Sequence, residues 1–90
     1  MRVSVDLSMY PLTRDYETPI KDFIRDLRRQ PGLTVATNPL ATQLTGDYDA
    51  VMDGLREAMR PVLAREEAVS FVIKILNVSI VPNQPFHLPD

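Results

Sequence analysis

The ten residues at positions 38–47, NPLATQLTGD, constrain the fold of this chain more than any other stretch. Their opening Asn-Pro favours a turn, because proline fixes its own φ and pushes the residue before it out of the helical region. Residues 41–45 form a short run rich in β-branched and polar residues, a composition that suits a strand better than a helix. The closing Gly-Asp predicts the end of that strand and an N-cap for a helix that begins near Tyr48. Turn, strand and helix start therefore share one short stretch, which joins two halves of a small domain.

The chain begins with strict alternation of apolar and polar residues. Residues 2–10 place apolar side chains on one face and polar side chains on the other, which predicts a half-buried strand. The apolar set is Val3, Val5, Leu7 and Met9, and the polar set is Ser4, Asp6, Ser8 and Tyr10. Pro11 is expected to end this strand.

Two other segments carry apolar residues at helical spacing. Before the first, a Thr-Pro pair at 18–19 predicts an N-cap followed by proline at the first helical position, and a Pro-Gly pair at 31–32 ends the helix. The second runs from about residue 48 to 66, and Pro61 within it predicts a kink, or a helix that ends near residue 60 and restarts. The apolar stripes are Ile20, Phe23, Ile24 and Leu27 in the first helix, and Val51, Leu55, Ala58, Met59 and Val62 in the second.

Two further strands, predicted at residues 33–37 and 68–78, complete the order βαββαβ. That order matches the ferredoxin-like split βαβ motif of the α+β class. Two right-handed crossovers then give a four-stranded antiparallel sheet in the order 4-1-3-2, with both helices on one face. We expect a single domain over residues 1–81. A Pro-rich tail follows at 82–90, either disordered or laid across a neighbouring surface.

Composition limits the partners and the chemistry. The 90 residues make one domain, and their net charge of −2 argues against nucleic acid or an anionic membrane as partner, because both need a concentrated positive field. No apolar run approaches the roughly 20 residues of a membrane span, so we expect no membrane insertion. Cysteine is absent and the single histidine, His87, lies in the tail, so neither a metal site nor a cofactor is expected. The lack of cysteine fits a cytoplasmic protein.

The predicted sheet face that carries no helix mixes polar and apolar side chains. On the last strand, Val72, Leu76 and Val78 fall on that face. An exposed apolar group of this kind is typical of an interface, and it predicts homo-oligomerisation through the sheet. Asp6 and Lys74 are predicted to be nearly opposite each other on adjacent strands, as a cross-strand pair.

The topology gathers polar side chains at one end of the sheet. The first two strands end there and the third begins there, which brings together Tyr10, Thr37, Asn38, Thr42 and Gln43. Alternation in the third strand places Thr42 on the face of the core residue Leu44, and Gln43 on the opposite face. Hydroxyls, amides and an aromatic ring around a small pocket suit a flat heterocycle. The alternative is that the threonines are ordinary strand residues and that Tyr10 caps the core.

Two sequence motifs also carry a family resemblance. SMYPL at residues 8–12 is similar to the S-[LM]-Y-P-[LM] signature of the YkoF-type thiamine-binding proteins. TNPLATQLTGDYD at residues 37–49 resembles that family's T-N-P-[ML]-[SA]-T-Q-[LV]-x-G-D-[YF]-D, and KILN at residues 74–77 resembles the end of its last strand. The resemblance covers residues 1 to about 80. The second motif is the more specific one, because it has many fixed positions.

The resemblance implies a ferredoxin-like fold whose single-domain members assemble as dimers or tetramers through their sheets. It implies binding of thiamine or its hydroxymethylpyrimidine portion, without catalysis, and an association of some members with uptake of the vitamin. It carries ligand binding to Ser8, Tyr10, Thr37, Asn38, Thr42 and Gln43.

The leading hypothesis is therefore a non-catalytic binding protein that acts in uptake, salvage or buffering of thiamine or hydroxymethylpyrimidine. An acylphosphatase-like enzyme is disfavoured, because the loop at residues 10–14, YPLTR, lacks the glycines that cradle a phosphate. An RNA-binding module is disfavoured by the aliphatic inner strands and the negative charge. A regulatory or structural homo-oligomer without a small ligand stays open as an alternative.

Overall fold

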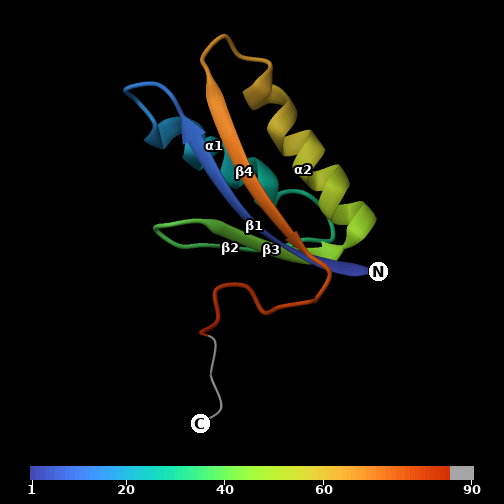
Figure 1. Ribbon diagram of the computed structural model, residues 1–90. Helices are drawn as coiled ribbons and strands as arrows, with labels where there is room; N and C mark the ends of the chain where they lie inside the picture. The colour runs from blue at the N-terminus through green and yellow to red at the C-terminus, as the bar shows by residue number, and fades with distance from the viewer. Residues whose placement is uncertain (86–90) are drawn as a thin grey trace.

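The computed structural model describes residues 1–85 and has the predicted order of elements. The sheet is four-stranded and antiparallel, in the order β2-β3-β1-β4, and both helices cover the same face (Figure 1). The elements are β1 (Arg2–Pro11), α1 (Glu17–Arg28), β2 (Thr34–Thr37), β3 (Thr42–Asp47), α2 (Tyr48–Leu63) and β4 (Val69–Leu76). The prediction of a ferredoxin-like α+β fold is confirmed.

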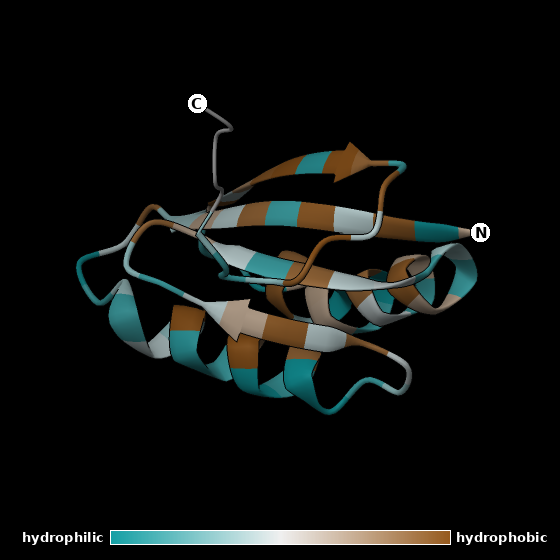
Figure 2. Cartoon of the chain, turned by 90° about the horizontal axis from the view of Figure 1, so that it is seen from below, coloured by the Kyte–Doolittle hydropathy of each residue, from teal (hydrophilic) through white to brown (hydrophobic). Residues whose placement is uncertain are grey.

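The core lies between the sheet and the two helices, as the alternation of β1 predicts. The residues of β1 that face the helices are almost fully buried, and their polar neighbours point to the opposite, open face. In Figure 2, α1 turns its hydrophobic side toward the sheet and its hydrophilic side outward. The buried apolar residues are Val3, Val5, Leu7, Met9, Phe23, Leu27, Leu44, Val51, Leu55, Ala58 and Val62. Their burial supplies the main driving force for folding.

The start of α1 differs from the prediction. The helix begins at Glu17 with Tyr16 as its N-cap, and the Asp15 carboxylate accepts a hydrogen bond from one early N–H group, that of Thr18 (3.3 Å). Thr18 is therefore not the N-cap. The first helical N–H groups have no intrahelical partner, so Pro19 is tolerated at the third helical position as well as at the first.

Gly46 does not end β3, contrary to the prediction. The strand continues through Gly46, which pairs with Val3, to Asp47. A Cβ on Gly46 would lie 2.6 Å from the carbonyl oxygen of Gly32. Glycine therefore allows a close backbone approach here. Asp47 is the N-cap of α2, but its side chain makes no capping hydrogen bond.

Pro61 does not interrupt α2, although a break and restart was one prediction. The helix continues from Tyr48 through Pro61 to Leu63, three residues short of the predicted end. Pro61 lies in the last turn and is exposed, so water can satisfy the one backbone carbonyl that loses its N–H partner.

The chain after β4 folds back over the open face of the sheet. The Ser4 hydroxyl donates to the Val78 carbonyl (2.6 Å) and accepts from the Ile80 N–H (3.0 Å). Farther along, the Asn83 N–H donates to Gln43 Oε1 (2.7 Å). Of the Pro-rich tail, the part up to residue 85 thus lies across its own sheet, and the rest, with His87, lies outside the described residues.

The register between β1 and β4 places Asp6 opposite Lys74, as predicted. The ion pairs found over residues 1–85 all lie on the two helices or at the C-cap of α1, so Asp6 and Lys74 are register partners that form no ion pair.

Candidate ligand-binding cleft

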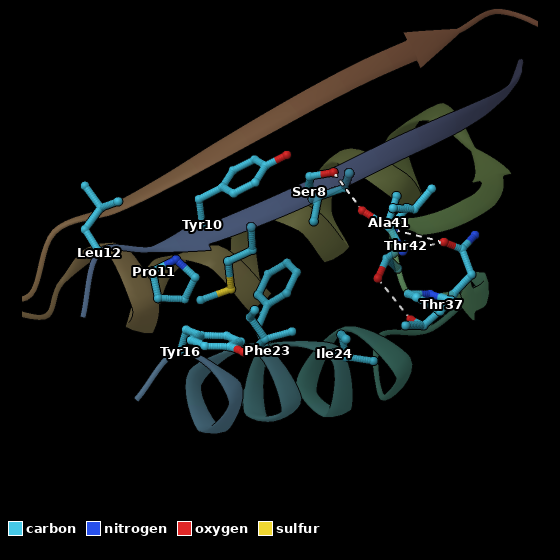
Figure 3. Close-up of a pocket in the computed structure, with 16 residues that line it drawn as sticks. Ser8, Tyr10, Pro11, Leu12, Tyr16, Phe23, Ile24, Thr37, Ala41 and Thr42 are labelled. Carbon is cyan, nitrogen blue, oxygen red and sulfur yellow. Dashed lines mark hydrogen bonds between the residues drawn. The ribbon is translucent and has the colours of Figure 1, made fainter. Parts of the chain in front are cut away.

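A cleft of about 380 Å³ lies at the end of β1, between α1 and the turn that joins β2 to β3 (Figure 3). It exists because the strands differ in length. Pairing of β1 with β3 ends at Leu7↔Thr42, whereas pairing with β4 continues to Pro11↔Val69. The last residues of β1 therefore have a neighbouring strand on one side only, and the space on the other side is the cleft.

A pair of hydroxyls lies at the inner end of the cleft. Thr37 ends β2 and Thr42 begins β3, and the two residues are register partners. Their Oγ1 atoms are 2.9 Å apart, close enough for a hydrogen bond in either direction. Thr42 is buried and Thr37 is exposed, so the pair spans the depth of the cleft. Each hydroxyl has further hydrogen-bonding capacity for a polar ligand atom.

Asn38 shapes the turn that forms one wall. Its Oδ1 accepts hydrogen bonds from the N–H groups of Leu40 (2.9 Å) and Ala41 (3.0 Å), and its backbone N–H donates to the Ala41 carbonyl (3.0 Å). Its Nδ2 donates to Asn83 Oδ1 (2.9 Å). An Asx turn of this kind fixes the loop conformation. The amide of Asn38 therefore acts mainly in holding the wall.

The rest of the cleft is apolar and aromatic. Phe23 and Ile24 of α1, with Tyr16 just before it, line the side toward the helix layer, and Pro11 and Leu12 line the outer end (Figure 3). Within the part of the chain that the structure describes, the lining contains hydroxyls and an amide but no charged side chain. It comprises Leu7, Ser8, Met9, Tyr10, Pro11, Leu12, Tyr16, Ile20, Phe23, Ile24, Thr37, Asn38, Pro39, Leu40, Ala41 and Thr42. Such a surface suits a small aromatic ligand with few polar atoms.

The structure brings five of the six predicted site residues to this cleft. Those residues are Ser8, Tyr10, Thr37, Asn38 and Thr42. Tyr10 is 53% exposed, and the Ser8 hydroxyl is 3.5 Å from the Leu40 carbonyl oxygen, so both can turn toward a ligand.

Gln43 is the exception. It follows Thr42 in β3, and alternation points its side chain to the open sheet face, where it joins Asp6 and Lys74 around a separate hollow. Its Oε1 accepts the hydrogen bond from Asn83. In this structure Gln43 anchors the C-terminal segment and does not line the cleft.

Sequence reasoning missed the apolar walls. Phe23 and Ile24 belong to the apolar stripe of α1, which predicts core packing. The same two residues also border the cleft. Tyr16 falls in a loop with no pattern. Leu40 lies in the turn and is 89% exposed, and nothing in the sequence pattern marks it as a cleft residue.

Within residues 1–85 no group of three or more histidine, cysteine, aspartate or glutamate side chains is placed to hold a metal ion. None of the helices described is long and apolar enough to cross a membrane.

The fold and the cleft together define a class: a small ferredoxin-like α+β domain with an uncharged cleft at the free end of its first strand. The model of the YkoF-related family matches residues 2–85, and the chain belongs to that family. Comparison with curated proteins gives no match.

Solved structures agree with this placement. A Streptococcus pneumoniae protein is 29% identical, with a TM-score of 0.76, and the match covers 90% of each chain. A hypothetical protein from Methanocaldococcus jannaschii is 27% identical with a TM-score of 0.74, over 92% of this chain and 87% of the other. A Thermotoga maritima protein, provisionally assigned to thiamine biosynthesis or salvage, is 19% identical with a TM-score of 0.64, over 81% and 82% of the two chains. At this level of identity, the similarity to the Thermotoga maritima protein shows a shared fold only.

Proposed function

We propose that this protein is a non-catalytic binding protein for thiamine or its hydroxymethylpyrimidine portion, acting in uptake, salvage or buffering of the vitamin. The observation that carries the proposal is the uncharged cleft with a hydroxyl pair at its inner end, in a member of the YkoF-related family. The Thermotoga maritima structure, provisionally assigned to thiamine biosynthesis or salvage, points to the same class of compound.

The cleft has the size and chemistry for such a ligand. Its volume of about 380 Å³ falls in the lower part of the range of small-molecule pockets. Threonine hydroxyls offer donors and acceptors to the polar atoms of a pyrimidine. The exposed rings of Tyr10 and Tyr16 offer apolar faces, and such faces also attract a cationic thiazolium.

The absence of catalysis is part of the proposal. A nucleophile needs a base within hydrogen-bond reach, and among residues 1–85 those that line the cleft include no carboxylate, imidazole or amine to serve as one. The serine and threonine hydroxyls there bond to a carbonyl oxygen or to each other.

Isothermal titration calorimetry with thiamine, hydroxymethylpyrimidine and thiamine diphosphate tests the proposal. We expect saturable heat with at least one of the first two compounds and a rise in Tm on adding it, because a ligand that binds only the folded state stabilises it. Absence of both heat and thermal shift with all three compounds would refute the proposal.

We also propose that the protein forms a homo-oligomer, a dimer or tetramer, through its sheet. Val72 and Leu76 of β4 are about half exposed on the open face, as is Val78, although β4 ends at Leu76 and not at residue 78 as predicted; β4 is an edge strand of the sheet. Exposed apolar residues on an edge strand favour association. Light scattering over a range of concentrations tests this, and a mass equal to one chain at every concentration would contradict it. If the sheet is not an interface, the alternative of a ligand-free oligomer also loses its support.

A further inference from the structure

The backbone of β1 has a free edge inside the cleft. Two hydrogen bonds just beyond the ends of β1 show toward which neighbouring strand the backbone groups of each residue point. The Leu12 N–H donates to the Ala68 carbonyl on the β4 side (2.9 Å), and the Met1 carbonyl accepts from the Tyr48 N–H on the β3 side (2.8 Å). In an antiparallel strand the N–H and C=O of one residue point to the same side, and successive residues alternate. Odd-numbered residues of β1 therefore address β3, and even-numbered residues address β4.

This alternation isolates Met9. It is odd-numbered, so its N–H and C=O point toward β3, but β3 begins only at Thr42, opposite Leu7. The register would place Leu40 opposite Met9, and the Leu40 N–H already donates to Asn38 Oδ1 (2.9 Å). The Met9 donor and acceptor are therefore left without a ladder partner, and Met9 lines the cleft.

Buried backbone groups are nearly always hydrogen-bonded, and leaving one without a partner is costly. Met9 is 8% exposed, so its free edge is a strong place for a ligand that restores the two bonds. A peptide strand cannot extend this edge, because the next odd residue is Pro11, which has no N–H. The edge therefore suits a small molecule that needs one donor and one acceptor.

We propose that the Met9 N–H and C=O bind the amidine edge of an aminopyrimidine, its ring nitrogen accepting from the N–H and its exocyclic amino group donating to the C=O. This inference rests on the proposed function and adds to it a backbone contact at the pyrimidine. A ring held in this way lies in the plane of the sheet. One of its faces then turns to Tyr16 beside the helix layer, and the other turns to the side of Ser8 and Tyr10 (Figure 3).

The same geometry gives the side chains different roles. The pyrimidine edge is recognised by the backbone, whereas the Thr37–Thr42 hydroxyls lie beside it and reach another polar substituent of the ligand. Replacing a cleft side chain is then expected to leave recognition of the amino group intact, because no side chain supplies that bond.

Nuclear magnetic resonance of the whole chain tests this directly. With 15N-labelled protein and 15N-labelled hydroxymethylpyrimidine, we expect the Met9 amide proton to move downfield and a scalar coupling to appear between the Met9 nitrogen and the ring nitrogen. The Tyr10 amide is the internal control: its N–H faces Ser70 of β4, so it should show no such coupling.

A pair of ligands provides a second measurement. The analogue that lacks the exocyclic amino group leaves the Met9 carbonyl unpaired, and we expect it to bind roughly 5- to 100-fold more weakly by calorimetry. That ratio should be nearly the same in the wild-type protein and in Thr42→Val, because in this arrangement the threonine hydroxyl does not contact the amino group.

The possible outcomes separate the two proposals. If the pyrimidine binds and the Met9 amide does not respond, the backbone contact is refuted and the proposed function stands. A penalty for the deamino analogue that disappears in Thr42→Val assigns the amino group to that threonine and likewise overturns the contact. If none of the pyrimidine compounds binds, the proposed function fails and the backbone contact fails with it.

Discussion

The two halves of β1 show how one strand can be both scaffold and site. Ser4 and Ser8 are the same residue type on the same face of the same strand. Ser4 is 3% exposed and bonds to Val78 and Ile80, with Thr45 Oγ1 3.2 Å away. Ser8 has one long contact, 3.5 Å to the Leu40 carbonyl oxygen. The chain after β4 covers the first serine and leaves the second at the mouth of the cleft.

The difference follows from where the neighbouring strand stops. From Ser4 to Leu7, β1 has a partner strand on both sides, so its backbone is saturated with ladder hydrogen bonds. Beyond Leu7 the β3 ladder ends, and hydrogen-bonding groups of both backbone and side chains become available. The groups available to bind a ligand therefore lie where the β1–β3 ladder ends, and ordinary strand residues supply them.

The largest loss of stability is expected beside the first half of β1, where Gly46 of β3 pairs with Val3. Gly46→Ala brings a Cβ to 2.6 Å from the Gly32 carbonyl oxygen, a backbone atom that cannot move away cheaply. We expect a loss of about 3 kcal/mol in the free energy of unfolding, measured by urea denaturation.

The matched control for this substitution is Gly54→Ala in α2. Its Cβ would lie 2.7 Å from Leu33 Cδ1, the end of a flexible side chain, and alanine favours a helix by about 1 kcal/mol over glycine. We expect its stability to stay within about 1 kcal/mol of wild type. Equal losses in both variants would show that the backbone approach at Gly46 has no special importance.

The two serines provide the next test. Ser4→Ala removes the partner of the Val78 carbonyl and of the Ile80 N–H, so we expect a loss of about 2 kcal/mol in stability with unchanged ligand affinity. Ser8→Ala should cost less than about 0.5 kcal/mol in stability and should act on affinity instead. Urea denaturation and calorimetry of both variants measure the two quantities. The comparison between the halves of β1 breaks down if the two variants lose the same stability.

Most of the fold could be predicted from the sequence, because it depends on local pattern. Alternation in β1 and the apolar stripe of α1 each follow from a periodicity that any reader of the sequence can count. The strand order follows from βαββαβ and the handedness of its crossovers. The sequence also placed five of the six site residues at one end of the sheet.

The errors concern contacts between distant segments. Gly46 reads as a strand breaker until the Gly32 carbonyl is seen beside it. Topology and the family resemblance predict Gln43 in the site, whereas the structure places its side chain on the open face, hydrogen-bonded to Asn83 forty residues later. The free edge of Met9 depends on where β3 begins, and strand ends are the least certain part of a sequence-based prediction.

Thr42→Val tests the inner end of the cleft. The substitution keeps the shape of the side chain and removes its hydroxyl, so we expect affinity for the pyrimidine ligand to fall about tenfold, with less than about 1 kcal/mol lost in stability. Thr34→Val is the control, because Thr34 is an exposed threonine in β2 that lies outside the cleft lining. Calorimetry on both variants should show weaker binding for Thr42→Val alone. Unchanged affinity in Thr42→Val would mean that Thr42 is a packing residue that does not contact the ligand.

The smallest effect is expected where the C-terminal segment meets the cleft wall. Asn83 has a φ of 65°, donates its backbone N–H to Gln43, and accepts a hydrogen bond from Asn38 through its side chain. Asn83→Gly keeps this backbone conformation accessible and deletes only the side-chain bond. Because that bond is exposed, we expect a loss of about 0.5 kcal/mol in stability and a decrease in affinity of less than about threefold.

Asn83→Ala provides the contrast, since alanine adds the strain of a positive φ to the lost bond. A larger loss of affinity in Asn83→Ala than in Asn83→Gly would mean that the course of the C-terminal backbone, held at Gln43, supports the turn at Asn38. Equal affinities in both variants and the wild type would mean that the Asx turn holds the wall alone. In that case the saturated and unsaturated halves of β1 are independent, and the segment after β4 serves only the scaffold.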